Sequence, residues 1–319
     1  MFPTRSNASE LKKTIDNFLE YLEIERGSSP LTIRNYRHYL MRLHDWLVKS
    51  GGAGSVDEIT EEAVRRYRLY LSRLRNERGD ALSRKTQGYY IIALRSFLRF
   101  LVRHDREVSL SAEKLELPKI EDRQVKFLSG ADMDRLLNAP SLSTLGGKRD
   151  KAILETFFST GLRISELVSL DRDKINFDKR ELGVVGKGGR ARVVFLSARA
   201  AEWLELYLKA RTDGFKALFI RHSGRVEPSM DDSQMRLSPR SIQRMVKKYV
   251  RKVGLSIEAT PHVIRHSFAT DLLTAGADLR SVQEMLGHKN VATTQIYTHV
   301  TNKQLRDVHR AFHSKGTKD

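Results

Sequence analysis

The sequence predicts a mainly α-helical protein of two domains, with one small β-hairpin or sheet in the second. Apolar residues recur at helical spacing through most of the first hundred positions, and this pattern decays over residues 108–128. Two short β-branched runs later flank a glycine-rich turn, which is typical of a hairpin. We therefore expect a four-helix domain over 1–107, a linker over 108–128 and a mixed helical domain over 129–319.

Four apolar stripes define the helices of the N-terminal domain. The stripes run from Leu11 to Leu22, from Ile33 to Leu47, from Val64 to Leu74 and from Ile91 to Leu101. Ser9 is a plausible N-cap of the first helix, because its hydroxyl can accept a hydrogen bond from a free N–H of the first turn. The second helix is expected to open at Ser29-Pro30, the third to begin after Thr60 and the fourth to follow Ser83. Pro30 suits the first turn of the second helix, and Gly51 is expected to end it.

The second domain is expected to place several helices around the hairpin. A first helical segment begins near Ser129, and the further helices are expected over Lys148–Thr160, Ile164–Leu170, Ser241–Val253, His262–Ala275, Leu279–Leu286 and Gln304–His313. Gly161 should close the helix before it, because glycine readily adopts the left-handed conformation of a helix end. The strands are expected over Glu181–Val185 and Arg192–Leu196, with Lys187 at the tip of the turn.

The charge of the chain points to a polyanionic partner. The formal net charge is +18, and the basic excess is present in both halves of the sequence. Such an excess favours double-stranded DNA as the partner, with a ribosome-like or merely solubilising charge as the alternative. Polar positions of the second and fourth helices are candidate DNA contacts, although they could also be solvated faces. These positions are Arg34, Arg37, Arg84, Lys85, Thr86 and Gln87.

The absence of cysteine and of long apolar runs excludes several classes of protein. Without cysteine the chain has no disulfide, thiolate zinc site, iron–sulfur cluster or cysteine nucleophile. No run approaches the roughly 18 apolar residues of a membrane span, and the first residues have no apolar signal core. We therefore expect a soluble, cytoplasmic protein without a membrane partner.

Six residues form a candidate site for phosphodiester chemistry. Arg163, in TGLRISEL, is one candidate for phosphate binding, and His262 and Arg265 project from one face of a later helix. Arginine suits phosphate because its planar fork donates two parallel hydrogen bonds. His288 precedes Tyr297 in LGHKNVATTQIYTHV. Lys187 is flanked by glycines in the turn between the two expected strands.

Tyr297 is the candidate nucleophile of this site. The ordinary pKa of tyrosine is about 10, so the hydroxyl needs cations or a base beside it to attack phosphorus. Lys187 could protonate a leaving 5′ oxygen as a general acid. Taken singly, these residues have ordinary alternative explanations. Tyr297 could be a packed tyrosine, Lys187 a solvated lysine in a turn, and His262 and Arg265 a coincidental pair on a helix surface. Together they predict a metal-free site that breaks and rejoins DNA through a covalent phosphotyrosine.

A metal site is the main chemical alternative. His262 and His266 lie one helical turn apart and could share a zinc ion. The zinc-protease pattern, however, requires a glutamate directly after the first histidine, and Val263 stands there. No cluster of Asp and Glu suggests a two-magnesium nuclease either. We expect no metal and no other cofactor.

These motifs resemble those of the tyrosine recombinase, or phage integrase, family. TGLRISEL, GKGGRARVV, HVIRHSFAT and LGHKNVATTQIYTHV occur in the order and at the spacing of that family, and the chain is most like its Xer-type members. The resemblance covers nearly the whole chain. It implies a two-domain DNA clamp, with a SAM-like core-binding domain over 1–107 and a catalytic domain from Ser129 onward.

The resemblance implies a role for each candidate residue. Arg163 and Arg265 resemble the two phosphate-binding arginines, and His262 resembles the histidine of the family's HxxR box. His288 resembles a residue that hydrogen-bonds the scissile phosphate. Glu166 matches an acidic position that supports the site from behind.

The resemblance also implies a reaction and an assembly. Tyr297 would attack phosphorus to give a 3′-phosphotyrosyl link, while Lys187 would protonate the 5′ hydroxyl that leaves. That hydroxyl would attack the partner duplex through a Holliday junction, without ATP. Four subunits would assemble on two DNA sites, either as copies of this chain alone or together with a second recombinase. The helix Gln304–His313 would dock on a neighbouring subunit.

The expected function is site-specific DNA recombination for the resolution of chromosome dimers, and three other functions remain open. A mobile-element integrase would use the same chemistry. A relaxing enzyme like type IB topoisomerases would rejoin the same strand, and a DNA-binding protein with a vestigial site would not cleave at all. The polar stretch Arg221–Arg236 is long for a compact Xer-type protein, which bears on its loop contacts and not on the chemistry.

Overall fold

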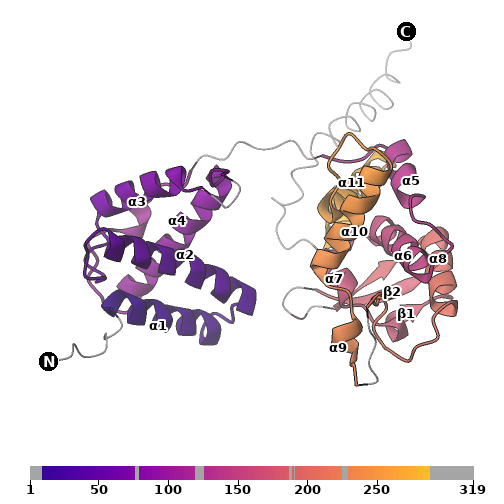
Figure 1. The fold of residues 1–319 in the computed structure, drawn as a ribbon, viewed down its shortest axis with the longest axis horizontal. Helices are drawn as coiled ribbons and strands as arrows, with labels where there is room; N and C mark the ends of the chain where they lie inside the picture. The colour runs from indigo at the N-terminus through magenta and orange to yellow at the C-terminus, as the bar shows by residue number, and fades with distance from the viewer. Residues whose placement is uncertain are drawn as a thin grey trace, which may run out of the picture. The chain divides into compact units, whose positions relative to one another are not determined.

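The chain divides into two compact units, Met1–Arg123 and Gln124–Asp319, in a computed structural model (Figure 1). The structure describes residues 9–75, 79–118, 126–186, 189, 191–224 and 229–287. Its described part is mainly helical with one small sheet, as the sequence predicts. None of the described helices is long and apolar enough to cross a membrane.

The N-terminal unit contains the four predicted helices and a short 3₁₀ helix. They are α1 (Glu10–Ile24), α2 (Pro30–Lys49), α3 (Glu61–Arg73), α4 (Arg84–Arg103) and η1 (Ala112–Lys114). The helices begin where the sequence predicts, and the side chains of Ser29, Thr60 and Ser83 each accept from a backbone N–H of the first turn. Ser9, the N-cap expected from the sequence, occupies that position without such a bond, because its hydroxyl lies 2.6 Å from the His44 ring nitrogen.

The predicted stripes meet in the core of this unit. Phe18 of α1 lies at its centre, with ring centroids 5.5 Å from Phe97 and 5.2 Å from Phe100 of α4. Leu110 and Leu115 are buried in the same core, whereas Leu128 is buried in the core of the other unit. Both ends of the segment expected to be a linker are therefore packed, and residues 119–125 lie outside the described part.

The C-terminal unit surrounds one central helix. Its helices are α5 (Gly130–Leu137), α6 (Leu145–Thr160), α7 (Ile164–Val168), η2 (Arg172–Lys174), α8 (Ala198–Lys209), α9 (Asp232–Met235), α10 (Pro239–Lys252), α11 (Pro261–Thr274) and α12 (Leu279–Leu286). Helix α6 packs against α8 and α11, and three of its charged residues, Asp150, Lys151 and Glu155, are buried. They are tolerated because they are paired: Lys151 lies 2.7 Å from Glu155, and Tyr249 donates to Asp150 at 2.8 Å.

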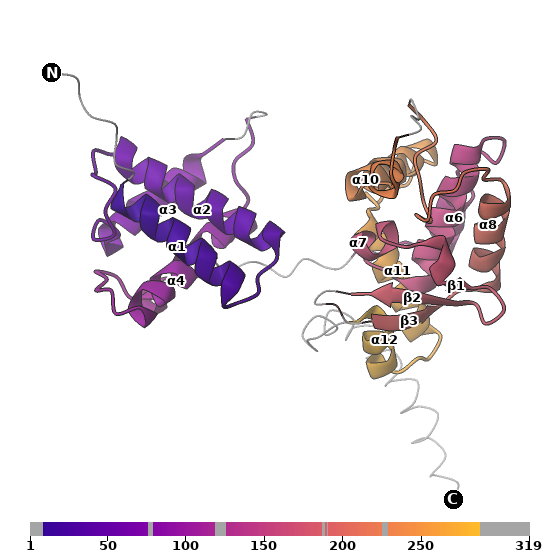
Figure 2. The same cartoon turned by 90° about the horizontal axis from the view of Figure 1, so that it is seen from below.

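The predicted hairpin is confirmed and belongs to a three-stranded antiparallel sheet. The strands β1 (Ile175–Asn176), β2 (Glu181–Val185) and β3 (Ala191–Phe195) pair in chain order. Val185 faces Ala191 in the last described pair before the turn, and Val184 faces Arg192. Figure 2 shows this hairpin lying between α7 and α12.

Four elements in the described part of this unit were not predicted from the sequence: η2, β1, α8 and α9. Strand β1 has only two residues, and α9 has one turn inside the polar stretch Arg221–Arg236. That stretch is anchored at its end, because Arg236 donates to the carbonyl oxygens of Val168 and Leu170 and pairs with Asp171 at 2.5 Å.

Candidate active site

Four helix ends meet at one place in the C-terminal unit. Helix α6 ends at Gly161 and α12 ends at Gly287, both in the left-handed conformation with φ of 58° and 64°. Helix α7 starts after Arg163, and α11 starts at Pro261 beside His262. The exposed backbone groups of these ends are available to side chains because helix termini lack partners within the helix.

Arg265 is held by the carbonyl groups of two of these ends. It is 5% exposed, and its guanidinium donates to Gly161 O at 2.5 Å and to Leu286 O at 2.7 Å. Two hydrogen bonds to rigid helix ends fix the plane of the guanidinium. A cation fixed in this way needs little reorganisation when it binds an anion.

Arg163 is fixed in a similar way, and its side chain remains one-third exposed. Its Nη2 donates to Gly287 O at 2.9 Å, and its Nη1 donates to Glu166 at 3.0 Å. The backbone N–H of Arg163 also donates to Glu166, as in a capping box. Arg163 and Arg265 therefore bind consecutive carbonyl groups at the end of α12, which brings the two predicted phosphate-binding arginines together.

Glu166 is buried at the base of this site, as a supporting carboxylate would be. Burial alone would raise the pKa of its carboxyl. The hydrogen bonds from Arg192 and Arg163, together with the charge of Arg192, outweigh that effect and lower the pKa to about 2. Glu166 is therefore ionised at neutral pH.

Arg192 is a member of this site that the sequence reasoning missed. It lies on β3 and donates to both oxygens of Glu166, at 3.0 and 2.9 Å. Residues of a strand point alternately to its two faces, and the neighbours Ala191 and Val193 are exposed. Arg192 is therefore a charged residue on the inward-facing side of β3. That pattern, within the motif GKGGRARVV, was the available signal.

His262 stands at the start of α11 with an exposed side chain. Partial desolvation by the surrounding protein, followed by the charges of Arg265 and Arg163, lowers the pKa of this imidazole. The pKa of His266 is lowered to about 4, first by burial and then by the charges of His262 and Arg265. Both imidazoles are therefore neutral at pH 7, where each has one donor and one acceptor nitrogen.

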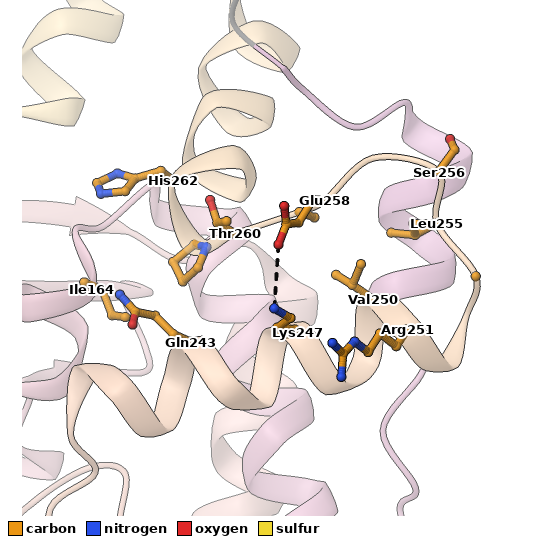
Figure 3. A pocket seen from close by; sticks show the side chains of 13 residues that line it. Ile164, Gln243, Lys247, Val250, Arg251, Leu255, Ser256, Glu258, Thr260 and His262 are labelled. Carbon is orange, nitrogen blue, oxygen red and sulfur yellow. Dashed lines mark ion pairs between the residues drawn. The ribbon is translucent and has the colours of Figure 1, made fainter. Parts of the chain in front are cut away.

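A pocket of about 600 Å³ opens beside His262 (Figure 3). Ile164 and Pro261 contribute apolar surface, and Lys247 and Arg251 of α10 contribute positive charge. Lys247 pairs loosely with Glu258 at 3.8 Å. The exposed face of α10 is basic along its length, with Arg240, Arg244, Lys247, Lys248 and Arg251. This face was also missed, although its basic residues alternate with a buried apolar stripe in the sequence.

The structure describes only part of the predicted catalytic set. Arg163, His262, Arg265 and Glu166 lie together, whereas Lys187, His288 and Tyr297 lie outside the described residues. The helix predicted over Gln304–His313 also lies outside them. The described cluster can bind a phosphate with two fixed guanidinium groups and a neutral imidazole.

The candidate DNA contacts of the N-terminal unit lie on α2 and α4. Arg34, Arg37, Arg84 and Lys85 are exposed, and Thr86 and Gln87 are half-buried. Arg84 and Gln87 line a hollow of about 260 Å³ together with Arg68 of α3. Arg37 pairs with Asp16 at 2.7 Å, so part of its charge is already compensated. The hydroxyl of Thr86 lies 2.8 Å from that of Ser83 and supports the helix cap.

The chain is similar to a known family over both units. The phage integrase family model matches residues 126–304, and the phage integrase N-terminal SAM-like domain matches residues 15–105. Tyrosine recombinase XerC of Pelotomaculum thermopropionicum is 37% identical over 302 residues, which cover 94% of this chain and 98% of that protein. Tyrosine recombinase XerD of Lacticaseibacillus casei is 34% identical over 308 residues, covering 95% and 99%.

Solved structures share the fold. The XerH site-specific recombinase bound to difH substrate, in its pre-cleavage complex, has a TM-score of 0.71 and 20% identity. The similarity covers 96% of this chain and 98% of that one. At this identity the likeness establishes the fold.

Proposed function

Because the chain belongs to the phage integrase family and is a tyrosine-type site-specific DNA recombinase, we propose that it cleaves DNA at the cluster of Arg163, His262 and Arg265. The supporting observation is that both arginines are fixed by the carbonyl groups that end α12. Two preorganised cations in one place can neutralise the non-bridging oxygens of a single phosphate.

Tyr297 is the proposed nucleophile. Its phenolic oxygen attacks phosphorus, the bond from phosphorus to the 5′ oxygen breaks, and a 3′-phosphotyrosyl link forms. His262 is neutral at pH 7 and can accept a proton or donate a hydrogen bond at this step. Lys187 is proposed to give its proton to the leaving 5′ oxygen, and His288 to hydrogen-bond the phosphate. The covalent link retains the energy of the phosphodiester, so rejoining requires no ATP.

Both units are proposed to bind double-stranded DNA. The basic face of α10 and the hollow formed by Arg68, Arg84 and Gln87 offer positive charge on each unit. Binding through many phosphates releases counterions, so affinity should fall steeply as salt rises. A flat salt response would contradict this assignment of the basic faces.

The biological role proposed is the resolution of chromosome dimers, as a tetramer on two DNA sites in the cytoplasm. This role rests on the similarity to Xer recombinases over nearly the full chain. A second recombinase is a candidate partner within that tetramer. Mobile-element integration uses the same chemistry, and the recombination sites in the host genome would distinguish the two.

A covalent trapping experiment tests the proposed chemistry. Nicked duplexes from a library selected for binding are incubated with the protein without divalent metal, and adducts that resist SDS are resolved on a gel. The wild type should form an adduct, and Tyr297→Phe should form none. Tyr89→Phe is the matched control, because Tyr89 is an exposed tyrosine of the N-terminal unit. An adduct that survives Tyr297→Phe would move the nucleophile elsewhere, and no adduct on bound DNA would favour a binding protein.

Strand exchange distinguishes recombination from relaxation. Two duplexes with different labels carry the same selected site, and the recombinant product is measured. A recombinase joins the labels, whereas a relaxing enzyme like type IB topoisomerases returns each strand to its own duplex.

A further inference from the structure

Glu166 lies between two guanidinium groups. Its Oε1 accepts from Nη1 of Arg163 and from Nη1 of Arg192, each at 3.0 Å. Its Oε2 accepts from the backbone N–H of Arg163 and from Nη2 of Arg192, each at 2.9 Å. The bond to Arg192 is thus bidentate, the geometry that gives an arginine–carboxylate pair both strength and direction.

The charges of this cluster do not cancel. One carboxylate, that of Glu166, faces the two guanidinium groups of Arg163 and Arg192, so these three side chains together carry one positive charge. Glu166 is 4% exposed and the Arg192 side chain 17% exposed, so water and salt screen this balance weakly. Without Arg192, the charge of Glu166 would be left to neutralise Arg163 alone.

Arg192 also joins three elements of the site. It pairs with Val184 near the turn end of the hairpin, and it reaches Glu166 on α7. Its guanidinium packs against Gly287, where an added Cβ would lie 3.2 to 3.3 Å from three of its atoms. Gly287 in turn accepts the hydrogen bond from Arg163.

We propose that Arg192 is a positioning residue for phosphate binding: it offsets the charge of Glu166 and so leaves Arg163 with a net positive charge for the phosphate. The inference rests on the proposed function, in which Arg163 binds the scissile phosphate. Arg192 itself faces Glu166 and acts through it.

A binding experiment separates this role from catalysis. Methylphosphonate, which is neutral, replaces one phosphate at a time across a selected DNA site, and affinity is measured by fluorescence anisotropy. All proteins carry Tyr297→Phe, so the measurement reports binding whether or not the wild type forms an adduct. In this parent, substitution at the phosphate bound by Arg163 should lower affinity about tenfold, as expected for one charged hydrogen-bonding contact.

Arg192→Met should reduce that loss to about threefold at the same position, because Arg163 then has little net charge to offer while Arg265 still contacts the phosphate. Arg199→Met removes a positive charge from α8 of the same unit and should leave the tenfold loss unchanged. A profile for Arg192→Met identical to the parent's would overturn the proposal. So would a parent profile without any sensitive position.

A double variant that restores the charge tests whether the role of Arg192 is merely structural. Adding Glu166→Gln to Arg192→Met removes the carboxylate and returns the cluster to one net positive charge. The loss on methylphosphonate substitution should then return to about the tenfold value of the parent. If Arg192 only supported the local fold, the loss would stay at the Arg192→Met value in the double variant, and the electrostatic role would be refuted.

Discussion

Gly161→Ala should destabilise the C-terminal unit more than an ordinary glycine replacement. Gly161 has a φ of +58°, and an added Cβ would lie 2.3 Å from Cδ1 of Phe268. Phe268 belongs to a packed apolar cluster with Leu273 and Leu286 and has little room to move. The carbonyl of Gly161 also holds Arg265, so the strain would reach the candidate active site.

The magnitude follows from two contributions. A left-handed conformation costs a non-glycine residue about 1–2 kcal/mol. Forcing an extra methyl group into a packed cluster costs about 1–3 kcal/mol more. Gly161→Ala should therefore lower the free energy of unfolding by about 2–5 kcal/mol.

Gly254→Ala is the matched control. Gly254 lies in the same unit with a φ of +63°, and nothing lies within 4 Å of its added Cβ. Gly254→Ala should lower the free energy of unfolding only by the cost of the left-handed conformation, about 1–2 kcal/mol. The difference between the two variants isolates the collision with Phe268.

Urea unfolding of the full chain measures both variants in a shared Trp46→Phe background. The chain has two tryptophans, so fluorescence then reports Trp203, which packs on the core of the C-terminal unit. With a slope of about 2 kcal/mol per molar urea, a difference of about 1–3 kcal/mol separates the midpoints by about 0.5–1.5 M. Equal midpoints for Gly161→Ala and Gly254→Ala would refute the steric argument.

Three further predictions concern charged groups of the C-terminal unit. Glu155→Gln leaves Lys151 in the core without its carboxylate and should cost about 3 kcal/mol by the same urea assay, whereas the exposed Glu202→Gln should be near neutral. Because the folded pKa of Glu166 is about 2, below the ordinary 4.5, its ionised form stabilises the fold above pH 4.5. That contribution, about 3 kcal/mol, is lost as pH falls from 4.5 toward 2, and a Glu166→Gln variant with an equally steep acid loss would contradict it. Since the pKa of His262 is lowered, adduct formation should decline only below pH 6.5; a decline centred above 6.5 would argue against a neutral imidazole.

Local pattern was sufficient for most of the secondary structure. The stripe from Leu11 to Leu22 and the later ones predicted α1 to α4, since helical periodicity is a property of the local sequence. Gly161 could also be identified as a helix end from local sequence, because glycine readily adopts the left-handed conformation found there. Short elements such as β1 and α9 carry too few residues to show a period, and they form because neighbouring segments hold them.

The candidate site divides in the same way. Arg163, Glu166, His262 and Arg265 could be predicted because motifs identify residue types and their order. Arg192 was missed because its importance comes from a contact between β3 and α7, 26 positions apart in the chain.

The sequence by itself determined the helical class, the basic surface, the absence of thiol chemistry and the family. These properties depend on composition and on short-range spacing. The tertiary structure decided that the ends of α6 and α12 hold the two arginines, and that one carboxylate is shared between Arg163 and Arg192. Net charge at the site depends on distances between segments remote in the chain, and only folding brings those segments together.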